Sequence, residues 1–189
     1  MEDYLVRSSN SVVIVAAILV CVTLGCSMLG RSGSGGAFND PQGKFTVNFP
    51  GGPGGVKEEK SEAKFAVSGN TYSKSFDNRS DNYRSYEVQA LGLGSSATEG
   101  KDQREILKIG LNGWDDEPET VVKDTSVNGQ KALDSVRTIE IGPAKMTFRE
   151  VVLWSEKDKK MYILQIAATK KENVSAKEAN DFVESFKLL

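Results

Sequence analysis

The sequence has 189 residues and 20.5 kDa, with 24 basic and 26 acidic side chains, two cysteines and no histidine. This length corresponds to one domain with an appendage. The lack of histidine excludes serine–histidine and cysteine–histidine catalysis and removes the commonest general base. A formal net charge of −2 provides no basic surface for a nucleic-acid backbone. We therefore expect no nucleic-acid partner.

An apolar segment lies near the N-terminus. Residues 8–30 carry no charged side chain, and residues 12–26 are almost wholly aliphatic. The uncharged segment is long enough to cross a bilayer as a helix, which takes about 20 residues. Its aliphatic part instead has the length of a signal-peptide apolar region, about 7–15 residues. The segment predicts either a signal peptide or a membrane anchor.

The end of this segment, Val22-Thr23-Leu24-Gly25-Cys26, resembles the lipobox of bacterial lipoproteins. The resemblance implies that the signal peptide is cut before Cys26 and that a diacylglycerol is attached to the thiol of Cys26. Leu24 stands two residues before the cysteine, whereas the family usually places leucine three before it. An uncleaved membrane helix and a buried core helix stay as alternatives. For a lipoprotein and for an uncleaved membrane helix alike, we expect the rest of the chain to lie outside the cytoplasm, anchored to the membrane of a bacterial cell envelope.

The remaining chain divides by composition. Residues 1–26 are the signal peptide or anchor, and residues 27–43 are rich in glycine and serine and show no apolar periodicity. Such a composition is typical of a flexible tether. Residues 44–189 change to short runs of alternating polarity, and a chain of this length can bury a core without disulfides or metals. We expect one globular domain over 44–189.

The first half of this domain predicts strands followed by one helix. Residues 44–49 alternate apolar and polar side chains and end at a glycine- and proline-rich turn. Two less regular extended runs follow at 63–76 and 83–93, and the first is expected at a sheet edge because it has few large apolar residues. Apolar spacing predicts a helix over 98–114, with a capping box spelled Ser96-Ala97-Thr98-Glu99.

The second half predicts an antiparallel meander and a final helix. Asn128-Gly129 is the preferred pair for a two-residue hairpin turn between strands at 119–127 and 130–141. Further strands are expected at 145–154 and 161–168. The last helix is expected to start at a second capping box, Ser175–Glu178, and to bury one stripe against the sheet. The fold class is therefore α+β, an antiparallel sheet of about six or seven strands packed with two amphipathic helices.

Three sequence patterns resemble a known family. The opening Gly43–Pro50, the Asn128-Gly129 hairpin followed by Arg137, and the ending Phe182–Lys187 are similar to those of small extracytoplasmic domains of the PsbP/Mog-like superfamily. That superfamily includes photosystem extrinsic subunits, a Ran-binding factor and many bacterial lipoproteins of unknown role. The resemblance implies a PsbP/Mog-like fold for 44–189 and transfers no active site.

One cluster of carboxylates is a candidate cation site. Asp115, Asp116, Glu117 and Glu119 lie together around Pro118, and hard cations such as calcium take oxygen ligands. The spacing is not that of an EF-hand loop, and a solvated loop between a helix and a strand has the same composition. We therefore predict no metal site, with these four residues as weak candidates.

A glycine motif could suggest a nucleotide cofactor. Gly92–Ala97 has the G-x-G-x-x-A spelling of a dinucleotide-binding turn. The predicted downstream hairpins exclude the parallel sheet that this motif needs, so the segment predicts an ordinary strand-to-helix turn. We expect no cofactor.

Two arginines lie on neighbouring predicted strands. Arg137 and Arg149 could form a cationic patch, or each could pair with a nearby carboxylate at the surface, Glu140 or Glu150.

These observations predict a membrane-tethered, extracytoplasmic, non-enzymatic binding or accessory module of the cell envelope. Its expected partners are the membrane, through the N-terminal lipid or helix, and an envelope protein or a small ligand. Two alternatives stay open. One is a hydrolase or carbohydrate-active enzyme that uses carboxylates alone, and the other is a structural domain that associates with itself.

Overall fold

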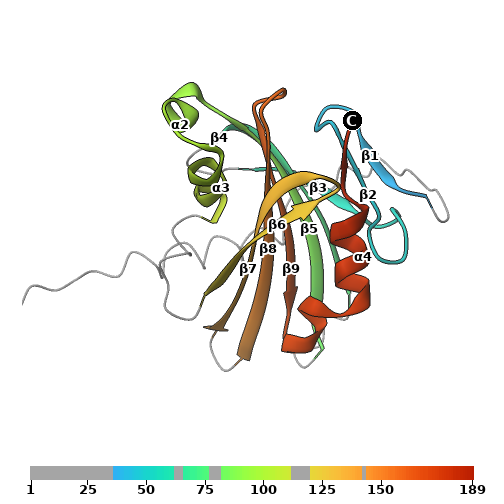
Figure 1. Ribbon diagram of the computed structural model, residues 1–189. Coiled ribbons are helices and arrows are strands. Elements are labelled where there is room, and N and C mark those ends of the chain that lie inside the picture. The colour runs from blue at the N-terminus through green and yellow to red at the C-terminus, as the bar shows by residue number, and fades with distance from the viewer. Residues whose placement is uncertain (1–35, 62–65, 77–81, 112–119, 142–143) are drawn as a thin grey trace, which may run out of the picture. The chain divides into compact units, whose positions relative to one another are not determined.

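The computed structural model describes residues 36–61, 66–76, 82–111, 120–141 and 144–189. All of them belong to one compact unit, residues 31–189. This unit combines a seven-stranded and a three-stranded antiparallel sheet with short helices (Figure 1). The α+β class is confirmed.

The elements follow one another in the order of the printed sequence. They are β1 (Phe38–Asp40), β2 (Phe45–Val47), β3 (Lys57–Lys60), β4 (Ala66–Phe76), β5 (Arg84–Leu93), α2 (Ser95–Thr98), α3 (Gln103–Leu111), β6 (Val121–Val127), β7 (Gln130–Ile141), β8 (Ala144–Ser155), β9 (Lys160–Ala168), the 3₁₀ helix η2 (Lys171–Ser175), α4 (Lys177–Ser185) and β10 (Lys187–Leu188).

The large sheet has the strand order β3-β4-β5-β9-β8-β7-β6. Strands β6 to β9 form the expected meander, and its first turn has positive φ at both Asn128 (47°) and Gly129 (81°). Positive φ at both positions is what a type I′ turn requires, so the Asn-Gly pair fixes the register of β6 against β7. Strand β9 then pairs with β5, which joins the meander to the first half of the domain.

Helices cover the two faces of the large sheet. One face, called here the α4 face, packs Tyr86, Tyr162 and other alternate residues against Phe182 and Phe186 from the C-terminal segment. The opposite α3 face packs Met161 and Ile163 of β9, among others, against α3. Both sides of the central strands are therefore apolar, and Figure 1 shows the two helices on either side of the sheet. The expected closing of the core by the last helix is confirmed.

The small sheet begins earlier than the predicted domain boundary. The tether was expected to run to Gly43, but Phe38–Asp40 forms β1 and pairs with β2. The Asp40 carboxylate accepts hydrogen bonds from the backbone N–H of Gln42 (3.0 Å) and Gly43 (2.8 Å) and from the Tyr72 hydroxyl (2.5 Å). These bonds fold a polar, glycine-containing segment into a fixed turn, so composition alone placed the boundary wrongly.

The prediction that the run at 63–76 lies at a sheet edge is also wrong. The run at 63–76 contains β4, which lies between β3 and β5, and the edge is occupied by β3. Strand β3 consists of four exposed residues with the sequence Lys-Glu-Glu-Lys. Such a segment has no apolar alternation, which is why the sequence pattern did not predict a strand there.

Neither predicted capping box forms. Within the expected helix at 98–114, the described residues form α3 from Gln103, and the short helix α2 lies almost entirely before this range, with Gly100 at φ 72° between the two helices. The real box lies at the start of α3, where Asp102 Oδ1 accepts from Glu105 N (2.8 Å) and Glu105 Oε2 accepts from Asp102 N (2.7 Å). At α4, Glu178 instead accepts hydrogen bonds from Arg84 Nη1 (2.8 Å) and the Tyr86 hydroxyl (3.2 Å).

The predicted anchor at 1–26, with Cys26, and residues 27–35 of the predicted tether lie outside the described residues. Within the described ranges, no helix combines the length and apolar character needed to cross a bilayer.

Candidate functional site

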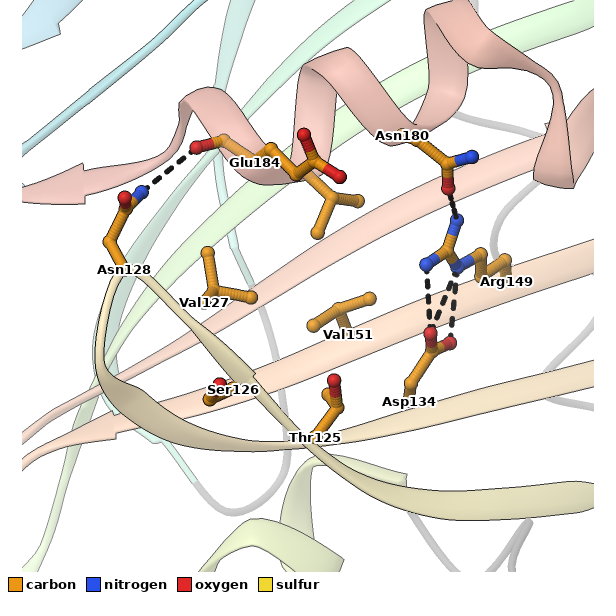
Figure 2. Close-up of a pocket in the computed structure, with 10 residues that line it drawn as sticks. Thr125, Ser126, Val127, Asn128, Asp134, Arg149, Val151, Asn180 and Glu184 are labelled. Carbon is orange, nitrogen blue, oxygen red and sulfur yellow. Dashed lines mark hydrogen bonds and ion pairs between the residues drawn. The ribbon is translucent and has the colours of Figure 1, made fainter.

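A groove of about 360 Å³ lies between α4 and the β6–β7 hairpin (Figure 2). One wall is a face of α4, and the other is the end of the hairpin. The lining residues are Thr125, Ser126, Val127 and Asn128 from the hairpin end, Asp134 from β7, Arg149 and Val151 from β8, and Asn180, Val183 and Glu184 from α4. The groove therefore lies on the α4 face of the sheet, beside the helix.

The hairpin turn closes one end of this groove. The Asn128 side-chain amide donates hydrogen bonds to the backbone carbonyls of Glu184 (2.8 Å) and Phe186 (2.7 Å). Carbonyls at a helix C-terminus have no partner within the helix, so a side-chain donor there satisfies them. Asn128 thus connects the turn to the end of α4 and joins the two walls of the groove at this end.

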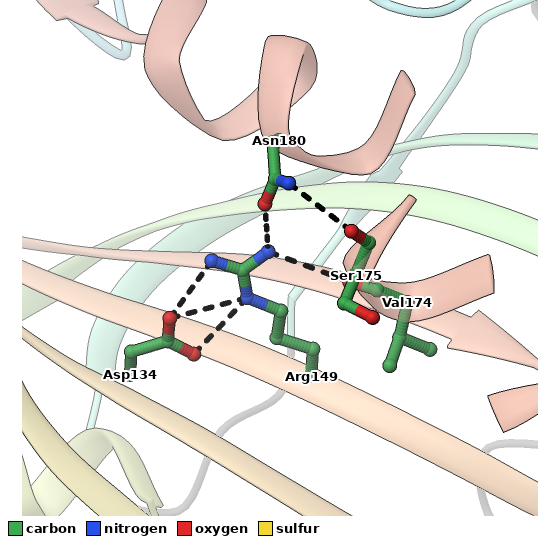
Figure 3. Close-up of polar contacts among 5 residues, drawn as sticks. All are labelled: Asp134, Arg149, Val174, Ser175 and Asn180. Atoms are coloured by element: carbon green, nitrogen blue, oxygen red, sulfur yellow. Dashed lines mark hydrogen bonds and ion pairs between the residues drawn. The ribbon is translucent and has the colours of Figure 1, made fainter. Parts of the chain in front are cut away.

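A polar cluster at the other end ties four elements together (Figure 3). Arg149 Nε donates to both Asp134 carboxylate oxygens (3.1 and 3.2 Å), and Nη2 donates to Oδ2 (2.8 Å). Arg149 Nη1 donates to Asn180 Oδ1 (2.6 Å) and the Val174 carbonyl (3.4 Å), and Asn180 Nδ2 donates to the Ser175 carbonyl (3.1 Å). The cluster connects β7, β8, η2 and α4.

The chemistry that the groove offers depends on which of its lining side chains already pair with one another. The Arg149 and Asp134 side chains are only 14% and 21% exposed and neutralise each other. The valines of the lining are buried, whereas Thr125 and Glu184 are exposed. The groove therefore offers a hydroxyl and a carboxylate to a ligand above a small apolar floor. A second cavity of about 260 Å³ shares Val127 and Asn128 with it.

The α3 face carries a row of polar side chains. Cross-strand register places Glu87, Gln165 and Glu150 side by side on β5, β9 and β8. Gln165 Nε2 donates to Glu150 Oε1 (2.8 Å), and Arg137 Nη2 approaches the same oxygen at 3.5 Å. Burial raises the pKa of the Glu150 carboxyl, an effect that the Arg137 charge and the Gln165 hydrogen bond oppose.

The pKa of the Glu87 carboxyl is likewise raised, first by burial and further by the charge of Glu150, although a hydrogen bond from Gln89 Nε2 (2.6 Å) opposes the shift. Neither Glu87 nor Glu150 lines either of the two cavities.

The structure separates the two arginines that could have formed a patch. Val136 is the register partner of Arg149, and Arg137 is the partner of Phe148, so the arginines point to opposite faces of the sheet. The predicted pairing of Arg137 with Glu150 exists, but it is buried rather than at the surface, and Glu140 pairs with Lys145 (3.3 Å). The prediction of a cationic patch is therefore wrong.

The weak cation candidates Asp115, Asp116, Glu117 and Glu119 lie outside the described residues, so their role stays a prediction. In the part of the chain that the structure describes, no three histidine, cysteine, aspartate or glutamate side chains come together as a metal site would require. Gly92 and Gly94 flank the end of β5, and α2 follows directly. The strand-to-helix turn is confirmed, on an antiparallel sheet.

Sequence reasoning missed Asp134 and Asn180, which hold Arg149. A weak signal was present for one of them, because Asp134 stands at a position of β7 that shares its face with the buried Ala132. A charged residue in the apolar phase of a strand indicates a specific partner. The partner could not be identified, since Arg149 and Asn180 are distant in the sequence.

Comparison with known proteins gives structural likeness only. No family model matches the chain, and no curated protein matches it. A solved structure from Bacteroides thetaiotaomicron VPI-5482 has a TM-score of 0.50 and 11% identity, covering 83% of this chain and 49% of that one. LpqN of Mycobacterium tuberculosis, described as involved in cell envelope biogenesis, has a TM-score of 0.40 and 13% identity, covering 76% of this chain and 90% of that one.

The chain thus spans about half the length of the Bacteroides protein. That likeness shows a shared fold and no more. The resemblance to the PsbP/Mog-like superfamily stays a prediction.

Proposed function

We propose that this protein is a membrane-tethered, extracytoplasmic binding module of the bacterial cell envelope and not an enzyme. The groove between α4 and the β6–β7 hairpin is its binding surface. The tethering rests on the apolar segment that ends in the lipobox-like sequence before Cys26.

The observation that carries the binding role is the construction of the groove. Its walls are fixed at one end by Asn128 and at the other by Arg149 with Asp134 and Asn180. Side chains held in place lose little conformational entropy when a partner binds, which favours recognition. The same bonds engage the Asp134 carboxylate, which accepts three hydrogen bonds from Arg149, so this carboxylate holds Arg149 in place.

A second candidate function rests on Glu87 and Glu150. These carboxylates share one face of the sheet with Gln165 between them, and burial raises both pKa values. Two such groups could serve a carboxylate-dependent hydrolase. Glu150 is held by Gln165 and Arg137, however, which favours a structural role. Loss of a measured glycosidase or esterase activity in both Glu87→Gln and Glu150→Gln would establish the enzyme instead.

The tethering is tested by Cys26→Ser in the full chain. We expect the variant to keep its apolar segment and to lose the gel-mobility shift caused by cleavage and lipid attachment. Globomycin, which blocks lipoprotein signal cleavage, should give an uncleaved precursor of the unaltered chain. A gel mobility that neither treatment changes would contradict the lipoprotein part of the proposal.

A further inference from the structure

Strand β6 differs from the other terminal strands of the two sheets. At the opposite edge of the large sheet, β3 has four residues and all are charged, while the outer strands of the small sheet, β1 and β10, have three and two residues. Short and charged edges resist pairing with another chain. Strand β6 has seven residues, six of them exposed or half-buried, and contains no proline. Of the described residues, it forms the longest open edge.

The backbone groups on this edge can be assigned from the register. In a two-residue hairpin the flanking residues, here Val127 and Gln130, form a hydrogen-bonded pair, and hydrogen-bonded residues then alternate along the strand. Val122, Asp124 and Ser126 therefore direct their N–H and C=O groups away from β7. The backbone hydrogen bonds found outside the helices and strand ladders of the described residues include none from these three.

We propose that β6 pairs antiparallel with β6 of a second copy of this chain, which joins the two large sheets into one. This inference names a partner for the α4-face groove and in that respect rests on the proposed binding role. Only one register satisfies all three outward residues of both copies. It sets Asp124 opposite Asp124 of the partner subunit and Val122 opposite Ser126 of the partner subunit, and each pair exchanges two backbone hydrogen bonds.

The same register brings a charge to the groove. Residues with the same face stay opposite each other, so Lys123 of the partner subunit lies across from Thr125, which lines the groove together with Glu184. Lys123 and Glu184 are both exposed and have no ion pair among the described residues, whereas Arg149 and Lys177 are each paired with an aspartate. The partner's Lys123 therefore supplies a cation beside the groove that is not already paired with an aspartate, unlike Arg149.

One contact opposes this dimer. Two Asp124 side chains face each other at its centre, and like charges directly opposite across strands are destabilising. Each Asp124 is ion-paired with its own Arg104, whose Nε lies 3.1 Å from Asp124 Oδ1. This pairing offsets the repulsion, and removal of the Asp124 charge should leave the dimer intact or strengthen it.

The test is the molar mass of the full chain in detergent, measured by light scattering over a range of micromolar concentrations. We expect a dimer for the unaltered chain. Asp124→Pro removes an outward N–H and places a ring against the incoming strand without breaking the β6–β7 ladder. It should give a monomer, whereas the matched control Asp124→Ala should stay dimeric. Equal β-sheet circular dichroism of the two variants verifies their fold.

A charge exchange tests the register independently of proline. Lys123→Glu should weaken dimerisation by about tenfold or more, because it sets a carboxylate beside Glu184, and the double variant Lys123→Glu/Glu184→Lys should restore it. A full chain that is monomeric at every concentration, or a dimer unaffected by both Asp124→Pro and Lys123→Glu, would overturn the inference. Either result leaves the Cys26→Ser outcome untouched, so failure of the dimer and failure of the tether are distinguishable.

Discussion

The two faces of the large sheet use charged side chains in different ways. On the α4 face, Arg149 is bonded to residues of β7, η2 and α4, and the apolar core lies beside it. On the α3 face, Glu87, Gln165 and Glu150 form a row across three strands, next to the aliphatic core under α3. A charge that links elements shapes a rigid groove, whereas charges within a sheet mainly alter how stability depends on pH. This difference supports the proposal that the α4 face is the binding side.

The largest effect is expected at the Arg149 cluster. Asp134→Ala leaves a largely buried guanidinium without its carboxylate, so the free energy of unfolding should fall by about 3 kcal/mol. Urea denaturation measures this loss. The double variant Asp134→Leu/Arg149→Met keeps the volume without either charge and should recover most of the stability. A single variant as stable as the parent would show that the cluster does not link these elements.

The next effect concerns the packing of α3. A Cβ atom at Gly110 would lie 2.6 Å from Val152 Cγ1 and 2.8 Å from Met161 Sδ. Gly110→Ala should therefore push the helix from the sheet and lower stability by about 2 kcal/mol, although alanine favours helices. The matched control is Gly54→Ala, where nothing lies within 4 Å of the added atom. Thermal unfolding of both variants measures the contrast, and equal midpoints would contradict the close packing.

A smaller effect is expected at the hairpin turn. Asn128→Gly retains the positive φ and loses only the two side-chain hydrogen bonds to Glu184 and Phe186, which should cost about 1 kcal/mol. Asn128→Ala loses the same bonds and must also adopt positive φ, at a further cost of about 1 kcal/mol. Hydrogen exchange at the end of α4 should quicken in both. If hydrogen exchange at the end of α4 is as slow in Asn128→Gly as in the parent, the Asn128 amide does not hold the hairpin turn to the end of α4.

The smallest effect separates the faces by pH. Because the folded-state pKa of Glu87 is raised, the folded protein binds this proton more tightly than the unfolded chain does. Its contribution to stability is complete below the unfolded pKa and is lost as pH rises through the folded pKa. The stability of Glu87→Gln minus that of the parent should therefore be more positive at pH 8 than at pH 4. Denaturation midpoints of variant and parent at pH 4 and pH 8 measure this difference, with the exposed Glu140→Gln as control. A difference between variant and parent that is the same at both pH values would contradict the expected pH dependence.

Local signals predicted the meander well. The Asn128-Gly129 turn and the apolar alternation of β9 each specify structure within a few residues, and both formed as expected. Strand β3 could not be predicted, because its four charged residues are held by pairing with β4 and not by their own pattern. The start of α3 was also missed. The motif Ser96–Glu99 matches the capping-box pattern and was chosen, although the capping box that forms is the one at Asp102 and Glu105.

The candidate groove was less predictable than the fold. The apolar alternation indicated the apolar face of several strands, such as β2 and β9, but the groove depends on Arg149 meeting Asp134 and Asn180 from separate elements. No local pattern encodes such a meeting. The open edge of β6 likewise follows from strand order, which the sequence left undetermined.

The most direct test compares the two faces in living cells. A photo-crosslinking amino acid is placed in the full chain either at Thr125, in the groove, or at Ser75, which is exposed on the α3 face. We predict crosslinked adducts from Thr125, including one at twice the mass of the chain, and none from Ser75. Adducts from Ser75 with none from Thr125 would contradict the central claim that the α4-face groove is the binding surface.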